Sequence, residues 1–184
     1  MRLSRQTITS IVTVILILLS ASVYAQSEDS LNDAEIADIA VTANQIDIDY
    51  AEIALERSRN DEVRNFAETM IRDHNAVIEQ AVELVTELGV TPMENDLSSQ
   101  LKEDAGDTKV MLRDKNRRSF DEVYIENEIA YHEAVIDVVR DVLIPQATNP
   151  ELKELLESVL PSLQAHLDHA NMVKDEITQS TGAY

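Results

Sequence analysis

The residues best suited to chemistry in this chain are three histidines and two carboxylates at positions that the sequence predicts to be buried. His74 and His166 fall near the middle of the apolar stripes of two predicted helices, and Asp47 falls on the apolar face of a third. Glu128 and His132, one helical turn apart, share the apolar arc of a fourth. Because all five lie near the middle of their helices, we expect them to meet at one level of the core.

Two arrangements would satisfy such a cluster, because a buried ionisable group is costly unless it is paired or bound to a metal. Imidazoles and carboxylates are ligands of Fe, Zn, Mn and Cu, so the first arrangement is a site for one divalent transition metal. The second is a metal-free hydrogen-bond network, to which Tyr50, Tyr124 and Tyr131 would contribute hydroxyl groups. The sequence leaves both open. We expect Asp73 and Asp168 to face solvent.

The elements that must position these residues are four long amphipathic helices. Apolar residues recur at helical spacing, and the chain contains only 3 glycines and 4 prolines to interrupt them. Pro145 should end the third helix, and Pro161 should kink the fourth. We predict an all-α fold with helices over residues 31–59, 61–88, 119–144 and 150–177, and a polar connection containing a short helix over residues 91–118.

Capping residues mark the ends of several of these helices. Asn60 and Asn149 are suited to be N-caps of the second and fourth helices. Ser119, with Glu122 three residues later, has the spacing of a capping box at the start of the third. Gly89 follows the second helix as a C-cap.

A weak internal repeat groups the helices into two hairpins. Tyr50-Ala51-Glu52 resembles Tyr131-His132-Glu133, and residues 60–64 resemble residues 149–153. The two helices of each hairpin would be antiparallel, and a connection as long as residues 91–118 can travel the length of the molecule. The second and third helices would then run parallel, which is the connectivity of a ferritin-like four-helix bundle.

The first residues have the pattern of a secretory signal peptide. Arg2 and Arg5 precede an apolar run over residues 8–19, and Val23-Tyr24-Ala25 resembles a cleavage site. A retained membrane anchor is the alternative, although the apolar run is shorter than the roughly 20 residues of a membrane span. We expect a protein exported to the periplasm or cell envelope, with a protein partner there. The predicted signal peptide, polar leader, helical domain and loose tail occupy residues 1–25, 26–30, 31–178 and 179–184.

The composition excludes several classes of function. The chain has 15 basic and 35 acidic residues and a net charge of −20, so it lacks the basic face that nucleic-acid binding requires. It contains no cysteine, which excludes disulfides, thiolate metal sites and thiol catalysis. The sequence contains no glycine-rich phosphate loop and no His-Glu-x-x-His motif, and we assign no catalytic residue.

Three different blocks of residues follow one another along the chain. They are Phe66-x-x-x-Met70-x-x-Asp73-His74, Phe120-Asp121-x-x-Tyr124 with His132 beyond it, and Leu160-Pro161-x-Leu163-x-x-His166-Leu167. Together they resemble a family of exported bacterial proteins with a ferritin-like domain of unknown function, often described as outer-membrane or periplasmic proteins. The resemblance spans about residues 33–173. It implies a four-helix ferritin-like fold and makes the three histidines signature positions, but it implies no activity.

The chain departs from the pattern of di-iron proteins, which carry a glutamate three residues before each of two histidines. Ile71 and Leu163 occupy those positions before His74 and His166. We therefore expect a mononuclear site at most. Three functions stay open: a metal-binding protein, a metal-free structural, stress or interaction protein of the envelope, and a metal-dependent oxidoreductase, for which the sequence shows neither an open coordination position nor a substrate route.

Overall fold

The computed structural model describes residues 30–181, which form helices and contain no strand. The predicted signal peptide and most of the polar leader lie outside the described residues. No helix within residues 30–181 combines the length and the apolar character that crossing a membrane requires. The helical segments are α1 (Asp33–Arg57), α2 (Asp61–Glu87), α3 (Asp96–Asp114), α4 (Phe120–Val138), η1 (Val139–Leu143), α5 (Ile144–Gln146) and α6 (Pro150–Thr181).

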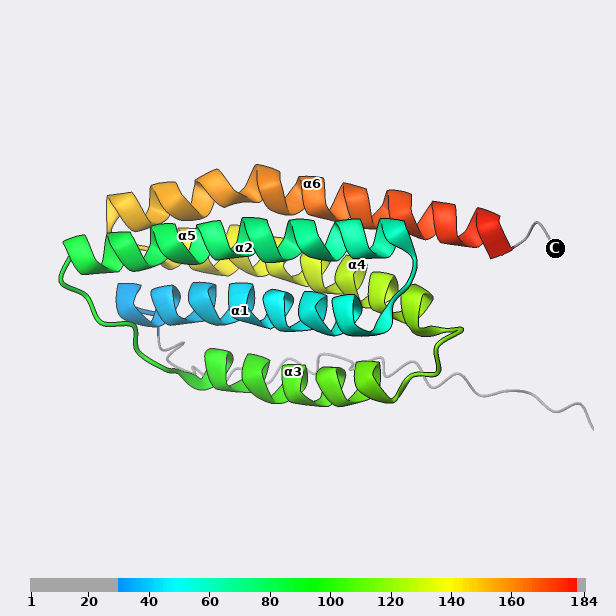
Figure 1. Cartoon of the computed structure of the whole chain (residues 1–184). Helices are drawn as coiled ribbons and strands as arrows, with labels where there is room; N and C mark the ends of the chain where they lie inside the picture. Colours follow the sequence, from blue (N-terminus) through cyan, green and yellow to red (C-terminus); the bar gives the residue numbers. More distant parts are fainter. Residues whose placement is uncertain (1–29, 182–184) are drawn as a thin grey trace, which may run out of the picture.

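Four long helical stretches lie side by side, and the connection between the two halves of the chain is itself helical (Figure 1). Helix α1 turns back into α2, and the α4–η1–α5 stretch turns back into α6. Between them, α3 crosses the molecule alongside α1, so that α2 and α4 run in the same direction (Figure 1). The predicted connection over residues 91–118 thus contains one helix of 19 residues, which spans roughly 28 Å.

The observed caps agree with most of the predicted ones. The Asn60 side chain accepts hydrogen bonds from the backbone of the first turn of α2, and Asn149 accepts one from Leu152 N at the start of α6. Gly89 has φ 64°, in the left-handed region that favours glycine, directly after α2. The prediction of a capping box at Ser119 is wrong. Its backbone is already helical, at φ −101° and ψ −2°, and its side chain makes no cap hydrogen bond.

Pro145 does not end the third predicted helix, which is a second correction. The helix passes through a π-helical segment, η1, and continues to Gln146. In η1 the Ile144 N–H bonds to the Val139 carbonyl, five residues earlier. A proline clashes with the carbonyl four residues before it, and the wider π turn accommodates the ring without breaking the helix. Helix α6 contains Pro161, bends near its middle (Figure 1) and runs to Thr181, past the predicted end at residue 177.

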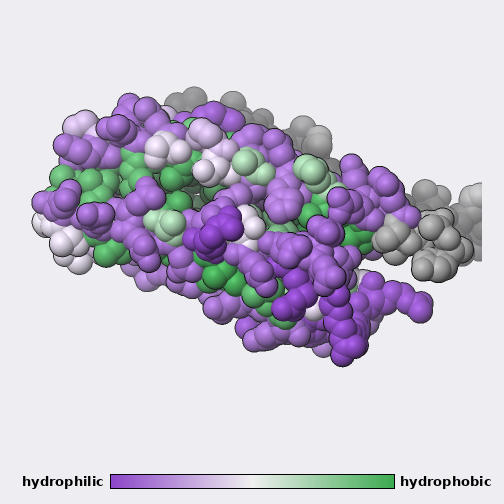
Figure 2. Space-filling view, turned by 45° about the horizontal axis from the view of Figure 1, so that its top comes forward, coloured by the Kyte–Doolittle hydropathy of each residue, from purple (hydrophilic) through white to green (hydrophobic). Residues whose placement is uncertain are grey.

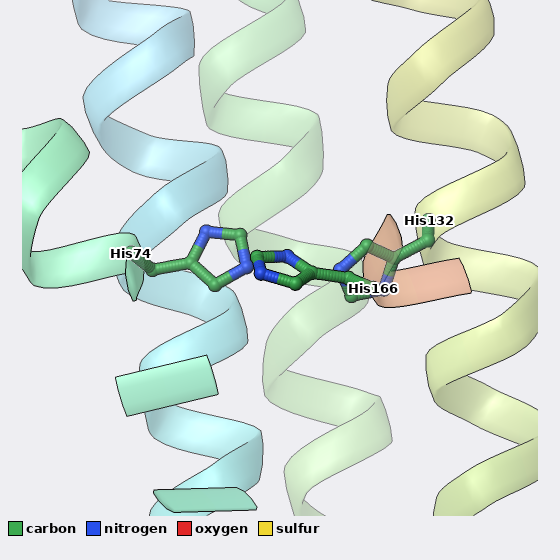
Figure 3. A group of neighbouring side chains, drawn as sticks. All are labelled: His74, His132 and His166. Carbon is green, nitrogen blue, oxygen red and sulfur yellow. The ribbon is translucent and has the colours of Figure 1, made fainter. Parts of the chain in front are cut away.

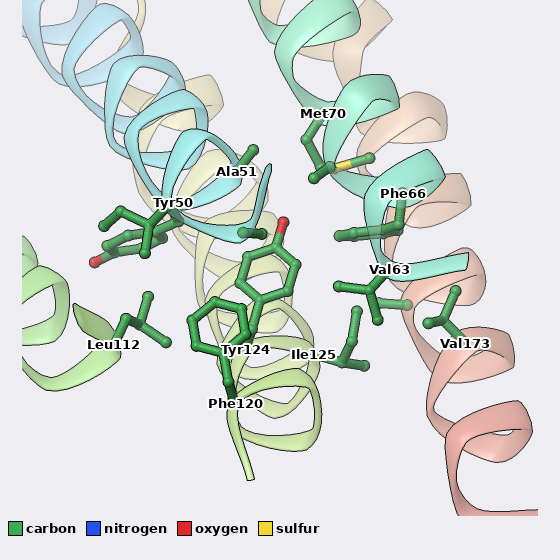
Figure 4. Packing of buried hydrophobic residues seen from close by; sticks show 14 of the residues in the cluster. Tyr50, Ala51, Val63, Phe66, Met70, Leu112, Phe120, Tyr124, Ile125 and Val173 are labelled. Carbon is green, nitrogen blue, oxygen red and sulfur yellow. The ribbon is translucent and has the colours of Figure 1, made fainter. Parts of the chain in front are cut away.

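The core consists of two apolar clusters, one toward each end of the helices. The first, the aromatic cluster, contains every buried phenylalanine and tyrosine of the described residues and lies near the α1–α2 turn (Figure 4). The second, the aliphatic cluster, lies near the start of α6 and contains no aromatic side chain. Its buried members are Ile36, Ile39, Val139, Leu143, Leu152, Leu156 and Leu163. The five ionisable residues predicted to be buried lie between these clusters.

Candidate metal centre

The three histidines of the sequence-based prediction meet in the core. His74 comes from α2, His132 from α4 and His166 from α6, and their rings point toward one another at one level (Figure 3). The ring centroids are 5.2 Å apart for His74 and His166, 5.5 Å for His132 and His166, and 5.8 Å for His74 and His132. All three are buried, with relative exposures of 6% or less.

Both carboxylates of the prediction join the same cluster and are completely buried. Asp47 Oδ2, on α1, lies 3.4 Å from His74 Nε2 and 3.5 Å from His132 Nε2. These approaches do not have hydrogen-bond geometry, and both oxygens of Asp47 lack a hydrogen-bond partner within the described residues. Glu128 Oε2 lies 3.8 Å from His132 Nδ1, and both of its carboxyl oxygens also lack a partner there. The cluster is therefore far from a satisfied polar network.

Each histidine uses one ring nitrogen to bond an oxygen at the edge of the cluster. His74 Nδ1 lies 2.7 Å from Asn44 Oδ1, His132 Nδ1 lies 2.9 Å from the backbone oxygen of Glu128, and His166 Nε2 lies 3.1 Å from Asp73 Oδ2. The orientation of the Asn44 amide is set by its Nδ2, which donates to the Ala40 carbonyl at 2.7 Å. All three partner atoms are acceptors, so these ring nitrogens carry the protons.

The opposite nitrogen of each ring consequently carries a lone pair. These atoms are His74 Nε2, His132 Nε2 and His166 Nδ1, and each is buried without a hydrogen-bond partner among residues 30–181. One nitrogen from each of the three rings can be chosen so that all lie within 4.8 Å of one another. In a tetrahedral site with metal–nitrogen bonds of about 2.05 Å the nitrogens are about 3.4 Å apart, so side-chain movements on the order of 1 Å would close a shell.

Burial keeps the cluster uncharged near neutral pH. It raises the pKa of Asp47 to about 8 and raises the pKa of Glu128 well above its usual range. It lowers the pKa of His74 to about 3 and that of His132 to about 4, and it also lowers the pKa of His166. The imidazoles are therefore neutral and able to act as ligands, whereas Asp47 must release its proton before it can bind a cation.

Two residues that support the histidines were not identified from the sequence. Asn44 lies one turn before Asp47 on the same face of α1, so its helical position was the available signal. Asp73 was predicted to face solvent, and that prediction needs correction: its side chain is 35% exposed and also bonds Arg72 and His166. Its contact across to α6 depends on how the helices pack, which the sequence pattern does not encode.

The tyrosines do not supply the partners that the network alternative requires. Tyr131 Oη donates to the Ala43 carbonyl at 2.9 Å, and the buried Tyr124 hydroxyl has no partner within the described residues. No hydrogen bond joins a tyrosine hydroxyl to a histidine in residues 30–181. The tyrosine rings instead pack against neighbouring rings, as Tyr50 does edge-on against Tyr131 with centroids 5.6 Å apart.

Comparisons with known proteins identify the family of this chain. Neither the curated proteins nor the solved structures contain a match. A family model described as "Domain of unknown function (DUF4142)" matches residues 19–173, which include all five residues of the cluster and both side-chain partners of the histidine rings, Asn44 and Asp73. The chain therefore belongs to the DUF4142 family.

Proposed function

We propose that this chain is an exported, ferritin-like four-helix bundle protein that binds one divalent transition metal through His74, His132 and His166. The observation that carries the proposal is the direction of the three rings. In each ring one nitrogen, the outer one, bonds an oxygen, and the opposite, inner nitrogen is buried without a hydrogen-bond partner among residues 30–181. One nitrogen from each ring lies within 4.8 Å of the others. Bonds from the outer nitrogen to an oxygen are the usual way in which proteins orient metal-binding histidines.

A metal accounts for the cluster better than a metal-free core does. A buried polar atom without a partner costs about 1–3 kcal/mol, and this cluster has several. A divalent cation would satisfy the three inner nitrogens together, and Asp47, next to two of them, would supply a carboxylate as the fourth ligand. Three nitrogens and one oxygen suit Zn, Fe or Cu, and Mn is the fourth metal to test.

The donor set supports one metal rather than two. A second possible group, formed by Asp47, Glu128 and His132, shares His132 and Asp47 with the proposed site. Ile71 and Leu163 occupy the places where di-iron proteins have bridging glutamates. We therefore assign Glu128 to the surroundings of the metal, beside Asp47 and the His132 ring, and not to a second centre.

The helix order and the first residues support the remaining parts of the proposal. The parallel run of α2 and α4, joined by the crossing helix α3, is the connectivity of ferritin-like bundles. The basic and apolar pattern of residues 1–25 supports export, with cleavage after Ala25. Intact mass spectrometry of protein isolated from the cell envelope should give a chain that begins at Gln26, and a chain that retains residues 1–25 would contradict this part.

Metal analysis of protein purified without an affinity tag tests the central claim. We expect about one metal per chain, and a rise in the unfolding temperature when metal-free protein receives Zn, Mn, Fe or Cu. Metal at 100 times its dissociation constant adds about 2.7 kcal/mol to the free energy of unfolding. Metal far below one per chain, with no thermal shift from any of the four ions, would refute metal binding and leave a metal-free envelope protein.

A matched pair of substitutions on α6 controls for changes of the fold. His166→Gln should abolish the metal-dependent rise in unfolding temperature. His169→Gln should keep it, because His169 lies outside the cluster and packs edge-on against Phe66, with ring centroids 5.1 Å apart. Equal metal binding by both variants would remove His166 from the site.

A further inference from the structure

A cavity of about 510 Å³ extends from the histidine cluster into one half of the molecule. Its wall includes the three histidines and Asp47, and it then follows the aliphatic cluster. On α2 its lining continues from His74 forward to Val85, and on α6 from His166 back to Leu152. Both directions lead to the end of the molecule where α2 finishes and α6 begins (Figure 1). The cavity therefore has a polar end at the histidines and an apolar body roughly 16 Å long.

The lining of the cavity reaches solvent on several helices. Its exposed residues include Asp104 on α3, Ala130 and Ala134 on α4, and Gln80 and Ser162 on the face formed by α2 and α6. Figure 2 shows apolar side chains recessed between rows of hydrophilic ones on this face of the molecule. A volume of about 510 Å³ falls within the range of small-molecule sites, about 300–1,000 Å³. Gln80 and Ser162 mark one route by which an apolar molecule could enter, between α2 and α6.

Tyr50 and Tyr131 line the histidine end of the cavity, and no aromatic side chain lies along the aliphatic cluster, which leaves this half less filled. At the other end the four buried phenylalanine and tyrosine rings fill the space between the helices (Figure 4). The aliphatic cluster has only isoleucine, leucine and valine side chains at corresponding depth. Close packing is the rule in protein interiors, so an open apolar volume next to a polar cluster is a feature that needs a ligand to explain it.

We propose that this cavity binds a single-chain amphiphile, an alkyl chain of medium length that ends in a carboxylate, with the carboxylate on the metal held by the three histidines. The proposal rests on the proposed metal site. The alkyl chain would lie against the aliphatic cluster, between residues such as Val85, Leu152 and Leu156. The carboxylate would sit at the histidine end, where the polar lining is concentrated.

Charge complementarity favours a carboxylate at that end. Three neutral imidazoles and the Asp47 carboxylate would leave a divalent metal with one net positive charge. The Asp73 carboxylate, which bonds His166 and is 35% exposed, offsets part of this charge from outside the ligands. The remaining charge next to an apolar wall is costly, and a carboxylate on the metal would lower that cost. A zinc centre with four ligands can accept a fifth. An alkyl alcohol would fill the same apolar volume without supplying this negative charge.

Calorimetric titration of the zinc-loaded and metal-free full chain with decanoate, decanol and acetate tests the proposal. We expect decanoate to bind zinc-loaded protein at least tenfold more tightly than it binds metal-free protein. Decanol should bind both forms alike, and acetate should bind neither measurably. If zinc-loaded protein does not bind decanoate, this inference is overturned, and the proposed metal site is not affected. A chain that takes up no metal would overturn both proposals.

A cavity-filling substitution tests the location of the alkyl chain. Ala81 lies buried in the cavity wall on α2, and Ala165 is exposed on α6, away from the lining. Ala81→Phe should weaken decanoate binding at least tenfold and retain one zinc per chain, whereas Ala165→Phe should change neither. If Ala81→Phe loses zinc or fails to fold, the milder Ala81→Val should still weaken the binding of decanoate more than the binding of zinc. Unchanged decanoate binding in both Ala81 variants would place the ligand elsewhere and contradict the proposal.

Discussion

Three kinds of partner hold the three histidines. His132 bonds the backbone carbonyl of its own helix one turn earlier, and this support moves with the helix. His74 depends on a side-chain amide from α1, and His166 on the half-exposed carboxylate of Asp73 on α2. Two of the three ring orientations therefore depend on correct packing between helices. Substitution of these supporting residues should weaken the proposed metal site without removing a ligand.

Asn44 offers the clearest test of this dependence. Asn44→Leu keeps the approximate size of the side chain but removes the oxygen that fixes the proton on His74 Nδ1. At the proposed metal site we expect affinity to fall about 10–100-fold, which is the usual effect of removing a hydrogen-bond partner of a metal-binding histidine. Competition with a chelator of known affinity measures the change. Asn75→Leu, at an exposed position on α2, is the control, and an equal effect there would argue against the role of Asn44.

The pKa values of the buried carboxyls predict how the stability of metal-free protein depends on pH. Asp47 has an ordinary pKa of 3.8 when unfolded and about 8 when folded, so between these values the folded chain holds a proton that the unfolded chain has released. The free energy of unfolding of the metal-free protein should therefore fall as pH rises. His74, with a pKa lowered to about 3, acts in the opposite sense below pH 6.5.

Above pH 6.5 only the carboxyl effect remains, and metal-free protein should lose stability up to about pH 8. The slope should be about 1.4 kcal/mol per pH unit for each carboxyl that keeps its proton. Urea unfolding in the presence of a chelator measures it. Asp47→Asn should reduce the slope, and Asp47→Asn combined with Glu128→Gln should remove it, because burial also raises the pKa of Glu128. A slope unchanged by both substitutions would contradict the assignment.

For single residues, helical periodicity was enough to predict the five residues of the cluster, but not the side chains that hydrogen-bond to the histidine rings. Asp47, His74, Glu128, His132 and His166 could be placed because each interrupts an apolar stripe near mid-helix. Whether a neighbouring side chain reaches a ring nitrogen depends on rotamers and on the distance between helices. For that reason the contact of Asp73 with His166 was not predictable from the sequence.

Among the elements, the start of α1 is fastened to the start of α6 by one side chain. Asp33 accepts hydrogen bonds from Thr148 N at 2.8 Å, Thr148 Oγ1 at 2.6 Å and Asn149 N at 3.1 Å. These bonds join residues more than a hundred positions apart, next to the aliphatic cluster. They fix the ends of the two helices at the end of the molecule where the cavity lies.

Asp33→Ala should therefore lower the free energy of unfolding by about 1 kcal/mol, because these hydrogen bonds are exposed and partly replaced by water. Chemical denaturation of metal-free protein measures the loss. Asp107→Ala, at an exposed position of α3, should lower the free energy of unfolding by less than Asp33→Ala does. A loss at Asp107 equal to that at Asp33 would mean that the bonds to residues 148 and 149 contribute nothing to stability.

Helix extents followed from composition and caps, whereas two local details did not. The second helix was predicted over residues 61–88 and is observed as Asp61–Glu87, because Asn60 and Gly89 act through local backbone geometry. Ser119 and Pro145 have the residue types that start and stop helices. Ser119 does not act as an N-cap, because its own backbone is already helical. Pro145 does not end the helix, because the wider π turn accommodates its ring.

For the molecule as a whole, the dominant property is its negative charge. The chain has a net charge of −20, and most of its carboxylates lie on the surface. Like charges repel one another in the compact state more than in the unfolded chain. Salt shortens the range of this repulsion, from about 10 Å at 0.1 M to about 3 Å at 1 M.

We therefore expect the urea midpoint of metal-free protein to rise between 0.05 and 1 M NaCl. Asp47→Asn should show the same rise, because Asp47 is buried and does not belong to the surface charge. A midpoint that is flat or falling across this range would show that surface repulsion does not limit stability. The experiment also separates this global effect from the local one at the cluster.

The all-helical class and the order of the helices were readable from the sequence, because repeats, caps and breakers are local. The long connection over residues 91–118 indicated that α2 and α4 run parallel, as they do (Figure 1). The cavity was not predictable, because it results from side-chain volumes summed across α1, α2, α3, α4 and α6. No single stretch of sequence contains that sum.

The hollow half has a mechanical consequence. The side chains along the cavity of about 510 Å³ lack packing partners on one side, whereas the rings of the aromatic cluster pack against one another. The leucine-lined end should therefore deform more easily than the ring-filled end. A molecule built in this way is stiff at one end and compliant at the other, with its histidines at the boundary.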